Sequence, residues 1–208
     1  MTRKQPIQPK REAVAIVGDG QTERIYFADV KDTDRPATLA IFPDYPRTIG
    51  SYAGVLKRAV ELADKDYDHV FALIDMDKIF QDNQQAAYLQ AKAAARARGI
   101  IVLENNPCFE LWILLHFVHT GRLFQNCGEV EHEIKKAGRL QGYDKSEKFQ
   151  VGARLYANYR DRLKDAAVPN ARLLENNRAD KDQLYPRAEI FRFFEWYLGM
   201  DAYIAKNE

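Results

Sequence analysis

The segment AVAIVGDGQTE, residues 13–23, decides the fold. Its first five residues are all apolar, which is typical of a strand buried on both faces, and a Gly-Asp-Gly turn ends that run. Thr22 then follows as a candidate cap for a helix that extends to about residue 31. A buried strand that leads through a glycine turn into a helix is the first half of a β-α-β unit. We therefore expect the central strand of a parallel sheet here.

The same alternation of strand and helix continues along the chain. Asn106 is placed to cap the last helix of this series, with Pro107 in its first turn. Such alternation predicts a parallel, doubly wound sheet with right-handed crossovers. The further strands are expected at residues 37–42, 69–74 and 100–103, and the further helices at residues 51–63, 84–98 and 107–118.

After Gly121 the strand-like runs stop and polar helical patterns take over, with helices expected at residues 130–140, 146–167 and 186–198. The predicted fold class is α/β: a parallel sheet flanked by helices, with a mostly helical C-terminal part packed on it. No linker rich in glycine and serine separates the parts. The expected organisation is a flexible basic arm (1–12), an α/β core (13–120) and a helical extension of the same domain (121–208).

Composition and charge limit the function classes. The chain has 208 residues, and its 31 Lys and Arg against 30 Asp and Glu give a net charge of +1, which excludes a globally basic protein that coats nucleic acid. No run of about 18 apolar residues and no apolar leader are present, so we expect a cytoplasmic protein without membrane contact. Cys108 and Cys127 are accordingly expected to be reduced.

Acidic residues follow three of the predicted strands. Because the carboxyl ends of parallel strands meet at one edge of a sheet, these acids can act together. In Asp75-Met76-Asp77 an extended backbone would point both carboxylates the same way, toward one cation or two. Oxygen ligands without His or Cys favour Mg²⁺ or Mn²⁺, whereas the alternative is a set of helix caps and solvated loop acids. The acids are Asp19 and Glu23 after the first strand, Asp75 and Asp77 after the third, and Glu104 and Glu110 after the fourth.

Glu110 lies within an otherwise apolar helix, where an unpaired carboxylate would be costly. It needs a metal, Asn105 or a basic residue as partner, and an active-site role and a structural role are equally compatible with the sequence. His116 and His119 are spaced for metal binding, but the apolar neighbours of His116 favour a core histidine.

Four lysines are candidates to neutralise a phosphate, although surface lysines are common: Lys78, Lys145, Lys148 and Lys181. The helix at 186–198 carries more aromatic surface than one stripe normally buries, so we expect part of it to be exposed for a partner. A dinucleotide fold is disfavoured because Glu23 replaces the third glycine of G-x-G-x-x-G, and a P-loop is excluded because its lysine is missing.

Three segments together resemble the RloB-like family, whose catalytic core is similar to the topoisomerase-primase (TOPRIM) domain. They are VGDGQTERIYF (17–27), LIDMDK (73–78) and NNPCFELWILLHF (105–117). The resemblance implies a Mg²⁺-dependent nuclease-like centre and a role in defence against phage or other foreign DNA, often beside a partner ATPase. It also implies that Glu23 is a general acid/base or a metal ligand and that Asp75 and Asp77 hold the metal.

The leading hypothesis is a Mg²⁺- or Mn²⁺-dependent phosphodiesterase that cuts DNA or RNA in bacterial defence. Its catalytic residues are Glu23, Asp75, Asp77 and Glu110, and the first three hold the metal. Expected partners are nucleic acid at a local site, an ATPase and a second copy of the chain. The alternative is a non-catalytic regulatory or interaction module, which the near-neutral charge favours slightly.

Overall fold

The sheet is the centre of the molecule. The computed structural model describes residues 11–45, 50–178 and 184–204, and its sheet has five strands in the order β2-β1-β3-β4-β5. The first four strands are parallel, as the sequence predicts, while β5 pairs antiparallel with β4. The strands are β1 (Glu12–Val17), β2 (Leu39–Asp44), β3 (His69–Asp75), β4 (Ile101–Asn106) and β5 (Arg187–Ala188).

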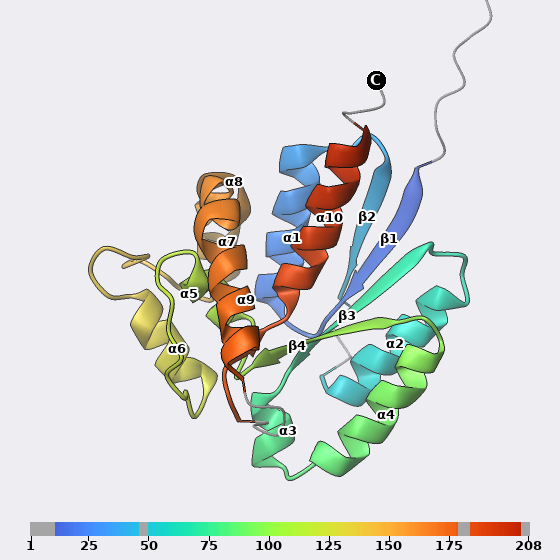
Figure 1. Cartoon of the computed structure of the whole chain (residues 1–208), viewed down its shortest axis with the longest axis horizontal. Helices are drawn as coiled ribbons and strands as arrows, with labels where there is room; N and C mark the ends of the chain where they lie inside the picture. The colour runs from blue at the N-terminus through green and yellow to red at the C-terminus, as the bar shows by residue number, and fades with distance from the viewer. Residues whose placement is uncertain (1–10, 46–49, 179–183, 205–208) are drawn as a thin grey trace, which may run out of the picture.

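Helices cover both faces of this sheet (Figure 1). Val14 and Ile16 of β1 contribute to one core together with α1, α5, α9 and α10, whereas Ala15 and Val17 contribute to a second core with α2, α3 and α4. The helical elements are α1 (Gln21–Asp34), α2 (Tyr52–Ala63), α3 (Asp77–Gln81), α4 (Gln85–Ala97), α5 (Glu110–Leu115), α6 (Cys127–Ile134), α7 (Glu147–Ala153), α8 (Leu155–Tyr159), the π-helical turn η1 (Leu163–Ala167), α9 (Val168–Asn177) and α10 (Ile190–Ile204). Because alternate side chains of β1 enter the two cores, residues 13–17 of this strand are all apolar.

The strand order creates a switch point beside β1. The chain proceeds from β1 to β2 on one side and then crosses back to β3 on the other side. Helix α1 consequently lies on one face and α2 on the other (Figure 1). In such sheets a crevice opens at the carboxyl ends of the two strands that flank the switch point. Here those strands are β1 and β3.

The junction after β4 differs from the sequence prediction. Asn106 does not cap a helix; it ends β4, and its side-chain amide donates to the carbonyl oxygens of Leu184 and Tyr185 at 2.8 and 3.0 Å. The Asn106–Pro107 peptide bond is cis, and α5 begins only at Glu110. The asparagine amide is used to hold the segment before β5 instead of a helix end.

The helical part also departs from prediction: α6 covers 127–134 and not 130–140, α9 lies outside the expected ranges, and two further departures have a local cause. The helix expected at 146–167 is divided because Arg154 adopts a left-handed conformation (φ 41°) between α7 and α8. The last helix starts at Ile190 and not at Pro186, because Arg187 and Ala188 pair with β4. Neither event has a glycine or proline signal at the residue concerned, so periodicity alone does not find it.

Most aromatic side chains of helix α10 are buried within the chain, whereas Trp196 is only partly buried. Phe193, Phe194 and Tyr197 are 0% exposed. The ring of Phe194 stacks on Trp112 at 5.4 Å between centroids, and Phe193 packs edge-on against Phe27 at 5.2 Å. Aromatic side chains on several sides of α10 find packing partners because the helix lies between the sheet and the neighbouring helices. The partner expected for this helix stays a prediction.

Cys108 and Cys127 form a disulfide, so the expectation of two reduced cysteines is wrong. That expectation rested on the expected cytoplasmic location of the protein. The chain folds back between α5 and α6 and brings the two Cα atoms to 5.7 Å, which is the usual separation for a disulfide.

Two other expectations, the basic arm and the absence of a membrane span, can be compared only with the residues that the structure describes. Residues 1–10 of the expected basic arm lie outside them, and β1 begins at Glu12. Within the described residues, every helix is too short or too polar to cross a bilayer.

Candidate metal and active site

A cavity of about 350 Å³ lies at the switch point. Asp19 lines it after β1, and Asp75 and Asp77 line it at the end of β3. Lys78 and Lys145 also line it, whereas Lys148 does not and Lys181 lies outside the described residues. The cavity therefore brings acids from two neighbouring strand ends together with two of the four candidate lysines.

A larger cavity of about 710 Å³ lies between α1 and α7, but charged side chains that line it are already paired with each other. Arg24 pairs with Glu147 at 3.2 Å, and Arg154 pairs with Asp29 at 3.0 Å. It contains none of the acids that the sequence singles out. Size is thus a weaker guide here than the convergence of unneutralised charges.

Glu23 lies in the first turn of α1 and is only 3% exposed. Its carboxylate folds against Gly20, where a Cβ atom would lie 1.7 Å from Oε2, so glycine is required to leave this space free. Burial, with smaller contributions from the charges of Glu110 and Asp19, raises the pKa of Glu23 to about 8. Glu23 does not line the cavity itself, but Gly20 does.

Asp75 is the last residue of β3, and Asn105 donates to its Oδ1 at 3.4 Å. Burial raises the pKa of Asp75 well above its ordinary value, and Glu23 is the largest contributor among the neighbouring charges. This mutual effect places Asp75 and Glu23 in one electrostatic cluster. A buried carboxylate among other carboxylates is costly unless a cation neutralises it.

Asp77 belongs to a helix and not to an extended segment. The chain turns at Met76 (φ −92°, ψ −16°), and Asp77 begins α3 with its Oδ1 accepting the backbone N–H of Lys78 at 2.6 Å. The alternation assumed for Asp75-Met76-Asp77 is therefore wrong. Both carboxylates still line the same cavity because the turn occurs at its rim.

Glu110 is 3% exposed, and its partners are now defined. Its Oε1 accepts from Tyr143 at 3.1 Å and from Thr22 at 3.4 Å, and Lys145 pairs with it at 3.0 Å. Thr22 thus binds Glu110 instead of capping α1. Of the alternatives considered for this buried acid, a basic residue is the partner, whereas Asn105 binds Asp75.

The disulfide lies directly beside this acid. Cys127 Sγ is 2.9 Å from Glu110 Oε2 and 3.4 Å from Lys145 Nζ. Among the described residues, Cys108, Glu110 and Cys127 form the one group of three whose ligand atoms lie within 4.8 Å of one another. The two sulfurs are bonded to each other, so they are not thiolate ligands in this structure. Glu23, Asp75 and Asp77 do not form so tight a group.

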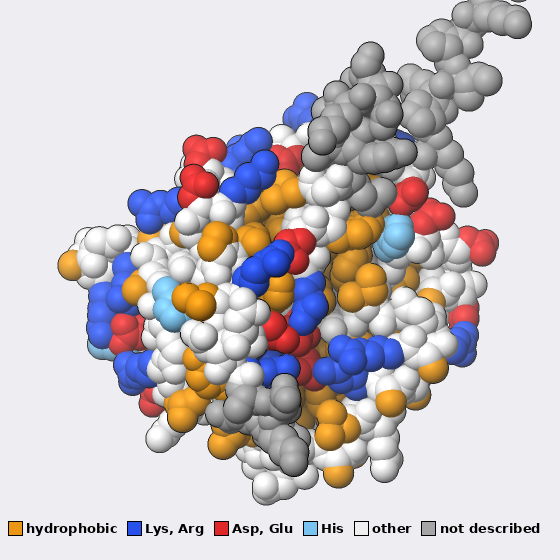
Figure 2. All heavy atoms as spheres, in the orientation of Figure 1, with side chains coloured by type: hydrophobic (Ala, Val, Ile, Leu, Met, Phe, Trp, Pro, Cys, Tyr) orange, Lys and Arg blue, Asp and Glu red, His pale blue; other side chains and the backbone are white. Residues whose placement is uncertain are grey.

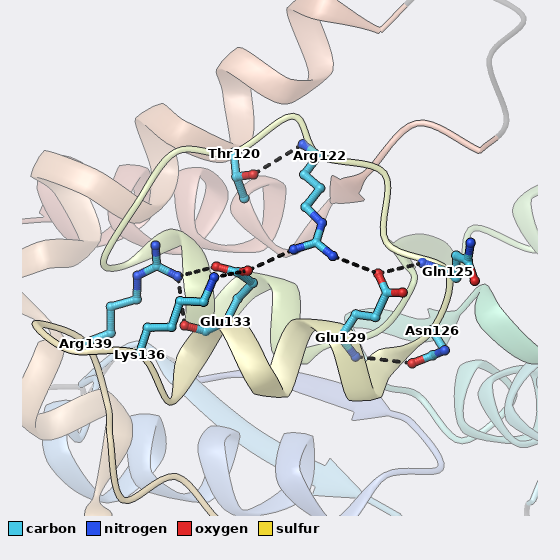
Figure 3. A network of polar contacts seen from close by, with 8 residues as sticks. All are labelled: Thr120, Arg122, Gln125, Asn126, Glu129, Glu133, Lys136 and Arg139. Atoms are coloured by element: carbon cyan, nitrogen blue, oxygen red, sulfur yellow. Dashed lines mark hydrogen bonds and ion pairs between the residues drawn. The ribbon is translucent and has the colours of Figure 1, made fainter.

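Helix α6, which carries Cys127, is fixed by an ion network (Figure 3). The carboxylate of Glu133 accepts from Lys136 at 2.5 Å and from Arg122 and Arg139 at 2.9 Å each. Lys136, followed by Arg139, holds the pKa of Glu133 below its ordinary value. The network keeps the disulfide side of the cavity in place.

Tyr45 is a candidate site residue that the sequence interpretation missed. It follows β2 directly, and its ring covers Gly18, where a Cβ atom would lie 2.5 Å from Cε1. The signal that identifies it is its position directly after β2, whose carboxyl end lies at the same edge of the sheet as those of β1 and β3. The interpretation considered only acids at strand ends and therefore passed over it.

His116 and His119 have different environments, and that of His116 is the one that the sequence favours. His116 is buried and its Nδ1 bonds to the carbonyl oxygen of Trp112 at 2.9 Å, whereas His119 is exposed. Burial lowers the pKa of His116 to about 4. His116 is a core residue.

The donor set fits a hard divalent cation. Asp19, Asp75 and Asp77 offer carboxylate oxygens to the cavity, and the raised pKa of Asp75 shows that its charge is poorly compensated by the protein alone. Lys145 is already shared between Glu110 and Glu131, at 3.0 Å from each. A site with two or three carboxylates that keeps several waters is the usual way proteins bind Mg²⁺.

The fold and the cavity define an α/β protein with an acidic centre at the switch point of a mostly parallel sheet. The chain belongs to the RloB-like protein family, which matches residues 14–195. Neither the curated proteins nor the solved structures include a match to this chain.

Proposed function

We propose that this protein hydrolyses phosphodiester bonds in DNA or RNA with the help of Mg²⁺ or Mn²⁺. One observation carries the proposal: carboxylates from the ends of β1 and β3 converge on one cavity with too few basic partners to neutralise them. Oxygen-rich, negatively charged sites of this kind serve phosphoryl chemistry. Membership of the RloB-like family agrees with it.

In this proposal Asp75 and Asp77 hold the cation, and Glu23 moves a proton. The bound cation polarises the phosphodiester and makes a water more acidic. A bond forms between the water oxygen and phosphorus, the bond to one sugar oxygen breaks, and the proton lost by the water balances the proton gained by that sugar oxygen. Glu23 is suited to this transfer because it is a carboxyl group in the same electrostatic cluster as Asp75.

Glu110 and the two cavity lysines have supporting roles. Lys78 and Lys145 bind phosphate oxygens at the cavity wall. Glu110 positions Lys145 and contributes to the high pKa of Glu23, so we assign it a positioning role and not contact with the substrate.

The wider role follows the family resemblance. We propose a TOPRIM-like centre that acts in bacterial defence against phage or other foreign DNA, under the control of a partner ATPase, in the cytoplasm. A disulfide is uncommon in a reducing compartment, so counting free thiols in protein alkylated inside intact cells tests the cytoplasmic assignment.

The nuclease proposal is tested by incubating the full chain, alone and with any ATPase encoded beside it, with plasmid DNA, single-stranded DNA and total tRNA. We expect cleavage in Mg²⁺ or Mn²⁺ that EDTA abolishes. Glu23→Gln keeps the shape of the side chain and removes its ability to take up or release a proton, and it should lower the rate by at least about 10²-fold. Glu61→Gln, on the exposed side of α2, is the matched control and should cut at the rate of the wild type.

One observation favours the second function, a non-catalytic interaction module. The ligand atoms of Glu23, Asp75 and Asp77 are not gathered as closely as those of Cys108, Glu110 and Cys127. Absence of cleavage under all these conditions, or a Glu23→Gln variant as active as the wild type, would replace the nuclease proposal with this one.

A further inference from the structure

We propose that the hydroxyl of Tyr45 donates a hydrogen bond to an oxygen bound at the cation site, which makes Tyr45 a positioning residue for the water or the phosphate held there. The inference rests on the proposed function because it assumes that the carboxylate cluster binds a divalent cation. It adds a buried neutral donor beside a cavity whose charged lining consists of carboxylates and lysines.

The fold places Tyr45 at the same edge as the acids. Strands β2 and β1 are neighbours, with Asp44 opposite Val17, so the residues that follow them, Tyr45 and Gly18, lie side by side. The Cε1 atom of Tyr45 occupies the space that a side chain at position 18 would take. The two glycines of the Gly-Asp-Gly turn thus make room for two groups, the ring of Tyr45 and the carboxylate of Glu23.

The hydroxyl oxygen of Tyr45 is buried and, among the residues that the structure describes, has no hydrogen-bond partner. Buried hydroxyl groups nearly always have a partner, because burying one without a hydrogen bond is unfavourable. An unpaired polar atom beside a candidate site is therefore evidence for a ligand that supplies the missing bond.

The surroundings of this hydroxyl identify the ligand chemistry. Burial raises the pKa of Tyr45 well above its ordinary value, and the charges of Glu23, Asp75 and Asp19 raise it further, whereas Arg24 lowers it. The group is thus a neutral O–H donor that the charges of three carboxylates influence and that bonds to none of the described residues. An oxygen bound to a cation among those carboxylates accepts such a hydrogen bond, while a second cation or an apolar group does not.

Tyr45→Phe tests the inference because it removes only the hydroxyl. Mn²⁺ binding is measured by isothermal titration calorimetry on the full chain, once with Mn²⁺ alone and once with Mn²⁺ and inorganic phosphate. We expect the variant to bind about tenfold more weakly in at least one arm, since a hydrogen bond to a charged group is lost. A loss with Mn²⁺ alone identifies the acceptor as a metal-bound water, and a loss restricted to the phosphate arm identifies a phosphate oxygen.

Thermal unfolding without metal separates this role from a structural one. If the hydroxyl has no partner in the metal-free protein, Tyr45→Phe will unfold at the same temperature as the wild type or slightly higher. Tyr67→Phe is the matched control: Tyr67 is half-buried, packs edge-on against Phe42 and precedes β3, whereas Tyr45 follows β2 at the edge where the acids lie, so the Mn²⁺ affinity of Tyr67→Phe should equal that of the wild type.

The outcomes distinguish this inference from the proposed function. Equal affinities of wild type and Tyr45→Phe in both arms overturn the inference alone, and so does a clear loss of stability in the metal-free variant with unchanged binding. A wild-type protein that binds no Mn²⁺ in either arm overturns the cation site itself and this inference with it.

Discussion

Single residues at the switch point determine where the side chains of the proposed site lie. Gly20 is a clear case, because the sequence shows only a turn there, whereas the structure shows that the absent side chain makes room for the carboxylate of Glu23. A side chain at Gly20 acts on the site without changing any acid.

Gly20→Ala should therefore remove activity while the fold persists. The added Cβ would lie 1.7 Å from Glu23 Oε2, and the carboxylate must move away. We expect nuclease activity close to that of Glu23→Gln and an unchanged circular dichroism spectrum. Gly99→Ala would be a poor control because Gly99 has φ 79°, whereas Gly152→Ala meets no atom within 4 Å and should keep full activity. Full activity of Gly20→Ala would show that the position of Glu23 does not matter.

His116 predicts a pH dependence of stability. Burial lowers its pKa from 6.5 to about 4, so the unfolded chain binds a proton between these values that the folded chain does not. Stability is retained above pH 6.5 and falls as the pH is lowered through this window, by about 2 kcal/mol between pH 7 and pH 5.

Urea unfolding of His116→Gln at both pH values measures this contribution. The variant should lose about 2 kcal/mol less than the wild type on acidification, whereas His119→Gln, at an exposed position, should behave as the wild type. An identical pH dependence in all three proteins would contradict the assignment of His116 as a neutral core residue.

Several site residues can be predicted from sequence because strand ends in a parallel sheet share an edge. Asp19, Asp75 and Asp77 line one cavity for that reason. Tyr45 occupies an equivalent position after β2, but a tyrosine after a strand has no chemical signature of its own. Its significance depends on its contact with Gly18, which only the folded chain reveals.

At the scale of elements, local signals predict the first half of the chain well. The four parallel strands follow from their apolar runs, and the helix expected at 51–63 is α2, which Ser51 caps with its Oγ accepting the N–H of Gly54 at 3.4 Å. Strand β5 is beyond such reasoning, because two residues cannot show a period. Its existence depends on pairing with Asn105 and Asn106 across the fold.

The disulfide joins two elements that no local pattern connects. Cys108 precedes α5 and Cys127 begins α6, at a sequence separation of 19. Closing a loop of this length stabilises a folded protein by about 3 kcal/mol. Protein prepared without reductant should show no alkylatable thiol when unfolded, and a thiol reductant should lower its free energy of unfolding by about that amount.

The double variant Cys108→Ser/Cys127→Ser is the control for this prediction. Its stability should not respond to the reductant, so any residual effect reports another process. Two alkylatable thiols in unreduced wild-type protein would contradict the disulfide and restore the expectation of reduced cysteines.

At the scale of the whole molecule, positive and negative charges are nearly balanced. Lys and Arg side chains alternate with Asp and Glu over the face shown in Figure 2, in agreement with the net charge of +1. Binding of nucleic acid in the proposed function must therefore be local, at the lysines of the cavity. Strand order and helix faces put the switch point of the sheet between β1 and β3, which is where the proposed centre lies.

The central claim, that this cavity holds a divalent cation, is tested most directly by an anomalous difference map from crystals of the full chain grown with Mn²⁺. We expect a peak within coordination distance of a carboxylate oxygen of Asp75, and no such peak in Asp75→Asn crystals grown in the same way. A map with no peak at the cavity, or a peak that Asp75→Asn leaves unchanged, would contradict it.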